Sequence, residues 1–78
     1  MNPKIGDYKT KDGEEAKILF IDLNANYPLI GAVKCENGWW VPECWDIDGY
    51  IYDPYGDYPF IGYNENTSMD ISEKDLIL

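Results

Sequence analysis

The side chains that could do chemistry in this chain are carboxylates, phenols, indoles, lysines and two thiols, because His and Arg do not occur among its 78 residues. Without histidine the commonest general acid or base is missing, and without arginine so is the bidentate clamp for phosphates. Apart from Lys34, neither Cys35 nor Cys44 has a basic neighbour that would lower the pKa of its thiol. We therefore expect both cysteines to act as small buried apolar side chains. The sequence predicts a protein that is not an enzyme and needs no cofactor.

Two pairs of acids are the remaining candidates for acid–base or metal chemistry. They are Asp46 with Asp48, and Asp53 with Asp57. Paired carboxylates can share catalytic work, but Asp before Gly or Pro is more simply a turn residue. A calcium loop with Gly49 at its sixth position would need acids at positions one and twelve, which are Cys44 and Tyr55 here. We therefore expect no metal site.

The stretch from Trp39 to Tyr63 holds most of the aromatic residues and no basic one. Rings with polar tips are typical of binding surfaces. Trp39 and Trp40 are adjacent, so on a strand they point to opposite faces and one of them can fill the core. Tyr50 and Tyr52 share a face, and both point outward if the residue between them points in. The stretch is predicted to be the binding surface, and the rest of the chain its frame.

The net charge of -9 is distributed unevenly along the chain. Residues 1–34 hold five lysines and five acids, whereas residues 35–73 hold nine acids and no base. The second region repels nucleic-acid phosphates and attracts basic protein surfaces. A simpler interpretation is that the charge only maintains solubility. Under either interpretation we expect no direct nucleic-acid partner.

The length predicts one domain over residues 1–78. A chain of this size buries only about 60% of its unfolded surface, so we expect self-association into a homo-oligomer to add burial. A two-residue turn at Asn37-Gly38 pairs Cys35 with Trp40 and places Cys44 about 13 Å away. That distance excludes a disulfide and indicates free thiols in a reducing compartment. No signal peptide or membrane span is evident, so the expected location is the cytoplasm.

Short strands separated by glycine-containing turns organise the chain. Asp12-Gly13, Asn37-Gly38 and Asp48-Gly49 are each typical of a β-hairpin turn, and no helical period is present. The strands between these signals cover residues 7–11, 15–23, 27–35, 39–45 and 50–52. The predicted fold is mainly β, an antiparallel meander of five or six strands forming a small barrel or half-open sheet.

Four local features refine this fold. The apolar run Ile18–Ile21 predicts a central strand covered on both faces. Gly31 within a strand indicates a bulge or sharp bend. Residues 54–66, rich in Tyr, Pro and Gly, are predicted to form a long surface loop. A last strand around residues 69–71 is favoured over a short helix that starts at Ser72.

Several short motifs occur in a recognisable order. They are Gly6-Asp7-Tyr8-Lys9-Thr10-Lys11-Asp12-Gly13, Ala16-Lys17-Ile18-Leu19, Asp22, Tyr27-Pro28-Leu29-Ile30-Gly31, Trp45, Asp48-Gly49 and Asp75-Leu76. This skeleton resembles that of a group of small phage and prophage proteins, although residues 54–66 are longer and richer in Tyr here. The resemblance implies a viral protein that acts inside the host cell, and it supplies no catalytic residues.

Counter-defence by binding is the function that we expect from these features. In one mechanism a homo-oligomer sequesters a nucleotide-derived immune signal, with aromatic rings stacked on bases and lysines against phosphates. The residues expected for it are Trp39 or Trp40, Tyr50 or Tyr52, Lys9, Lys11 and Lys17.

Two alternatives remain. In the first, the acidic half mimics nucleic acid and docks on a host nuclease or other defence protein, in the manner of an anti-CRISPR inhibitor. It would use Asp46, Asp48, Asp53 and Asp57 in place of phosphates, and Tyr55 and Tyr58 as anchors. In the second, the chain is a structural or assembly accessory protein.

Overall fold

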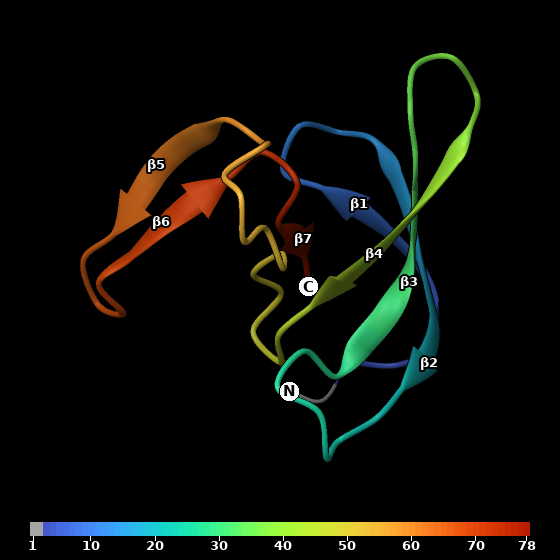
Figure 1. Ribbon diagram of the computed structural model, residues 1–78, viewed down its shortest axis with the longest axis horizontal. Helices are drawn as coiled ribbons and strands as arrows, with labels where there is room; N and C mark the ends of the chain where they lie inside the picture. The colour runs from blue at the N-terminus through green and yellow to red at the C-terminus, as the bar shows by residue number, and fades with distance from the viewer. Residues whose placement is uncertain (1–2) are drawn as a thin grey trace.

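The computed structural model describes residues 3–78, so the first two residues of the expected 1–78 domain lie outside it (Figure 1). Its seven strands are β1 (Gly6–Thr10), β2 (Glu15–Ile21), β3 (Leu29–Lys34), β4 (Trp40–Trp45), β5 (Phe60–Asn64), β6 (Met69–Ser72) and β7 (Leu76–Ile77). Five strands form a half-open antiparallel sheet in the order β4-β3-β2-β1-β7, and β5 pairs with β6 in a separate hairpin. The predicted mainly β fold is confirmed.

The three predicted hairpin turns share one geometry, which differs from a two-residue turn. In the turn between β3 and β4, Gly38 N donates to Cys35 O over 2.9 Å, and Cys35 N donates to Trp39 O over 2.8 Å. Gly38 has a φ of 85°, whereas Ser68 is the only non-glycine with positive φ in residues 3–78. A two-residue type I′ turn needs positive φ at both central positions, so a three-residue loop ending in glycine forms instead. The expected pairing of Cys35 with Trp40 is therefore wrong.

The hydrophobic core lies on one face of the sheet. Its buried members are Ala16, Ile18, Leu29, Val33, Trp45, Ile51 and Leu76. Trp45 is fully buried, and its Nε1 donates to the carbonyl of Lys74 over 2.9 Å. The expectation that Trp39 or Trp40 fills the core is wrong, because these side chains are 73% and 41% exposed.

The opposite face of the sheet, here called the outer face, is not covered by any described part of the chain. Leu19 and Phe20 are 61% and 57% exposed, so the prediction that β2 is buried on both faces is wrong. The predicted irregularity at Gly31 is confirmed, because the register of β2 against β3 shifts between Ile18 and Phe20. A Cβ atom on Gly31 would overlap the carbonyl oxygen of Lys17.

The second half of the chain differs most from its prediction. The expected loop at residues 54–66 contains β5, which with β6 forms a hairpin that projects from the sheet (Figure 1). The expected strand near residues 69–71 is β6, and β7 was not predicted. No helix starts at Ser72. The expected strand at residues 50–52 is reduced to one bridge between Ile51 and Trp45.

Candidate binding site on the outer face of the sheet

Side chains on the outer face form three parallel rows across the strands, because every second residue of a strand points to that face. Row one contains Trp40, Lys34, Glu15 and Lys9, and row two contains Pro42, Ala32, Lys17 and Asp7. Row three contains Cys44, Ile30 and Phe20. The rows run from a basic and aromatic end of the face to an apolar end.

Rows one and two place lysines on the same part of the outer face as the Trp40 ring. Lys17 Nζ lies 5.7 Å from the centroid of the ring, which is a cation–π distance. Lys34 is the cross-strand partner of Trp40. Lys9, Lys17 and Trp40 line one hollow of about 310 Å³. A ligand in this hollow meets an indole and two lysines, together with the carboxylates of Asp7 and Glu15.

Exposed acids accompany these lysines. Asp7 lies 3.3 Å from Lys17 Nζ, and Glu15 lies 4.0 Å from Lys34 Nζ. Three lysines against two acids give these rows a net charge of +1, in a chain whose net charge is -9. Ion pairs between exposed side chains contribute little free energy. An anionic ligand can therefore replace the acids as partners of the lysines with a small loss of free energy.

A second hollow of about 380 Å³ lies where row three meets the end of β4. It is lined by Tyr27, Ile30, Gly31, Pro42, Glu43, Cys44 and Tyr52. The rings of Tyr27 and Tyr52 pack edge to face, with centroids 4.7 Å apart and an interplanar angle of 61°. Burial, together with the nearby Glu43 carboxylate, raises the pKa of the Cys44 thiol, so Cys44 contributes an apolar wall.

The structure divides the residues expected to bind a nucleotide between different places. Lys9, Lys17 and Trp40 meet at the first hollow, and Tyr52 lines the second. Trp39 lies before β4, in the turn opposite Cys35. Lys11 and Tyr50 line a separate pocket between the β5–β6 hairpin and the sheet.

Lys34 is a residue of the site that the sequence prediction missed. The two-residue turn assumed for Asn37-Gly38 paired Cys35 with Trp40, whereas the three-residue loop shifts the register by one and places Lys34 opposite Trp40 on the neighbouring strand. The sequence did contain a signal for the longer loop. A two-residue turn at Asn37-Gly38 requires a positive φ at Asn37, because only one of its two residues is glycine.

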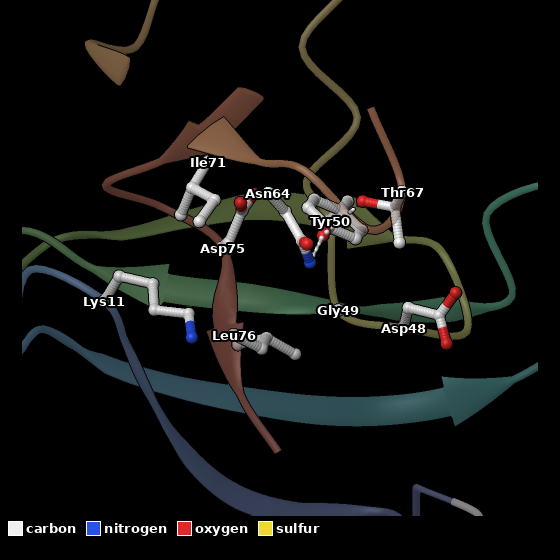
Figure 2. A pocket seen from close by; sticks show the side chains of 9 residues that line it. All are labelled: Lys11, Asp48, Gly49, Tyr50, Asn64, Thr67, Ile71, Asp75 and Leu76. Carbon is white, nitrogen blue, oxygen red and sulfur yellow. Dashed lines mark hydrogen bonds between the residues drawn. The ribbon is translucent and has the colours of Figure 1, made fainter. Parts of the chain in front are cut away.

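The pocket between hairpin and sheet has a volume of about 370 Å³ (Figure 2). Its polar groups largely bind one another: Asn64 Nδ2 donates to Tyr50 Oη over 3.0 Å, and Tyr50 Oη lies 3.2 Å from Thr67 Oγ1. Burial raises the pKa of Asp75, although backbone hydrogen bonds from Ile51 and Ser72 oppose this shift. These contacts attach the hairpin to the sheet, so we assign the pocket a structural role.

The acids expected to mimic phosphates serve partly as turn residues. Asp46 Oδ1 accepts hydrogen bonds from the backbone of Asp48 and Tyr50, over 3.0 and 2.9 Å. Asp53 likewise accepts hydrogen bonds from the backbone of Asp57 and Tyr58. Two of the four carboxylates are therefore already bonded within their own loops, while Asp48 and Asp57 are exposed.

The two tyrosines expected as anchors differ in environment. Tyr55 is 87% exposed at the end of its loop. Tyr58 is partly buried against the core, and burial, together with the hydrogen bond to Glu43, raises its pKa to about 12. Lys74 Nζ lies 5.9 Å from its ring. Tyr58 is thus part of the interior, whereas Tyr55 is available to a partner.

Lys74 is the centre of a charge cluster that connects the β1–β2 turn with the segment before β7. Its Nζ contacts Glu14, lies 2.5 Å from Asp12, and lies 3.7 Å from Glu73. Burial alone lowers the pKa of Lys74, but the hydrogen bonds to Asp12 and Glu14 outweigh it and hold that pKa above its ordinary value. The cluster connects the end of the chain to the β1–β2 turn.

Comparison of the chain with protein-family models, with curated proteins and with solved structures finds no match. Within residues 3–78, no group of three or more His, Cys, Asp or Glu side chains is placed to hold a metal ion. The same residues contain no helix that is long and apolar enough to cross a membrane.

Proposed function

We propose that this chain is a non-enzymatic phage counter-defence protein that sequesters a nucleotide-derived immune signal on the outer face of its sheet. One observation carries the binding part of the proposal: the exposed indole of Trp40 lies 5.7 Å from Lys17 Nζ, shares a hollow with Lys9 and is the cross-strand neighbour of Lys34. The viral and host-cell context rests on the resemblance of the sequence skeleton to small phage and prophage proteins.

A nucleotide matches this surface chemically. A base stacked on an aromatic side chain contributes about 1–3 kcal/mol, and Trp40 is 41% exposed. The lysine ammonium groups supply donors for phosphate oxygens. A long nucleic acid matches less well, because the net charge of +1 is confined to these rows and the remaining chain is strongly acidic.

The expected homo-oligomer has a separate surface available. The β5–β6 hairpin exposes Phe60, Ile61, Tyr63 and Met69, at 61%, 55%, 56% and 40%. A two-stranded hairpin is marginally stable when it stands alone. Packing this hairpin against another copy supplies burial that one copy lacks, and leaves the outer face accessible.

The proposal is tested by native mass spectrometry of protein purified from infected host cells, on wild type and two matched variants. Trp40→Ala removes the ring at the site, and Trp39→Ala removes its sequence neighbour in the turn. We expect an added mass of nucleotide size on wild type and Trp39→Ala, and its loss in Trp40→Ala. A co-purified host protein without a nucleotide overturns the proposal in favour of the acidic inhibitor.

A further inference from the structure

The outer face offers two positions for flat rings along one line. Trp40 begins β4, and Cys44 lies four residues further along the same strand, about 13 Å away. Tyr52 lies beside Cys44, because its backbone N donates to Cys44 O over 2.9 Å. The first hollow contains Trp40, and the second contains Tyr52 with its edge-to-face partner Tyr27.

A cation lies to one side of these two positions, on β2, two strands from β4. Row two separates the rows of Trp40 and Cys44, and it contributes Lys17 to the first hollow and Pro42 to the second. Ala32 lies between Pro42 and Lys17 in that row, and its methyl side chain projects little from the sheet. Pro42 therefore separates the two aromatic positions along β4, and the ammonium group of Lys17 lies beside the Trp40 ring.

We propose that the ligand of this face is a dinucleotide, with one base on Trp40, the linking phosphate at Lys17 and the second base in the Tyr27–Tyr52 hollow. This inference rests on the proposed function and specifies its ligand class. Successive bases of a duplex strand lie about 3.4 Å apart, so a ligand that spans about 13 Å holds its bases splayed. Splayed bases stacked on side chains are the usual mode of single-strand recognition.

The charges near the two hollows favour a ligand no longer than a dinucleotide. Beyond the second hollow, the turns that follow Cys44 and Tyr52 contain the acids Asp46 and Asp53. A longer strand would place further phosphates against these carboxylates, which repel them. A mononucleotide would leave one of the two hollows empty.

The test is isothermal titration calorimetry with pApA, pGpG and pUpU, their mononucleotides AMP, GMP and UMP, and the decanucleotide dA10. For at least one base we expect the dinucleotide to bind about 5- to 150-fold more tightly than the mononucleotide, the factor for one added stack. Tyr52→Ala should reduce that affinity to the mononucleotide level, and Trp40→Ala should weaken both. Trp39→Ala is the control, since this exposed residue lines neither of the two hollows.

The outcomes separate the two proposals. Equal affinity for dinucleotides and mononucleotides, or a dinucleotide affinity unchanged in Tyr52→Ala, overturns the dinucleotide and leaves nucleotide binding at Trp40 intact. Tightest binding of dA10 also overturns it and indicates a single-stranded nucleic acid. Failure of every probe to bind wild type contradicts both proposals. Circular dichroism of each variant verifies folding.

Discussion

Replacing Glu43 by Gln should stabilise the protein. Glu43 belongs to the edge strand β4 opposite Gly31, on the core side of the sheet, and its Oε2 is buried with no hydrogen-bond partner in residues 3–78. Burial raises the pKa of Glu43 above its ordinary value of 4.5, although the hydrogen bond from Tyr58 opposes the shift. An unsatisfied buried polar group costs about 1–3 kcal/mol. Glutamine keeps a polar group at this position but removes the charge, which is the costlier group to bury. Because the side chain is only partly buried, we expect a gain of about 1 kcal/mol.

The pH dependence of this gain follows from the direction of the shift. A carboxyl whose pKa is raised on folding binds its proton more tightly in the native state, so its contribution to stability falls as pH rises from 4.5. The advantage of Glu43→Gln should therefore be full at pH 7 and shrink as pH approaches 4. At pH 7 the melting temperature should rise by about 4–8 °C, measured by calorimetry.

Two further measurements isolate the cause. Glu65→Gln removes the same charge from an exposed position and should leave the melting temperature nearly unchanged. Ultraviolet titration should show that the pKa of Tyr58, about 12 in wild type, falls in Glu43→Gln. Burial is the largest cause of the raised pKa of Tyr58, and the hydrogen bond and charge of Glu43 are the next. A Glu43→Gln variant no more stable than wild type at pH 7, or a gain that persists undiminished at pH 4, would refute the reasoning.

Three other substitutions test how the fold is held together. Gly31→Ala should cost about 1–3 kcal/mol in urea unfolding, because the added methyl group overlaps the Lys17 carbonyl and forces the bulge to move; an unchanged midpoint would contradict the close approach. Trp45→Ala should cost about 3–5 kcal/mol in the same assay, through a cavity and the lost bond to Lys74, and Trp39→Ala less than 1. Asp75→Asn should lower stability by about 2 kcal/mol and speed amide exchange at Ile51 or Ser72, because one backbone N–H then faces an amide donor. Slow exchange at both amides would show that the carboxylate does not hold them.

The class of fold and its turns were predictable from the sequence because their causes are local. Glycine at the end of each turn provides the positive φ that the hairpin needs, so Gly13, Gly38 and Gly49 marked three of the connections correctly. Gly31 marked the bulge for a similar reason, since a side chain there would meet the neighbouring strand. The spacing of Cys35 and Cys44 along one hairpin likewise indicated two free thiols, which the structure contains.

The composition of the site depended on tertiary structure. Whether a hairpin loop has two or three residues changes the cross-strand register by one, and that single step placed Lys34 rather than Cys35 beside Trp40. The identity of the core tryptophan was also undetermined, because Trp40 and Trp45 lie on opposite faces of β4 and only the packing of the sheet selects the buried face.

The end of the chain was the least predictable part. Asp75 lies 24 residues from Ile51 in the sequence, yet its carboxylate binds the Ile51 backbone, and a contact of that range leaves no local pattern. The sequence by itself thus determined the β class, the turns and the supply of aromatic rings and lysines, because backbone sterics and composition are local properties. The tertiary structure decided which rings and lysines meet on the outer face, because register and burial depend on strands that are distant in the chain.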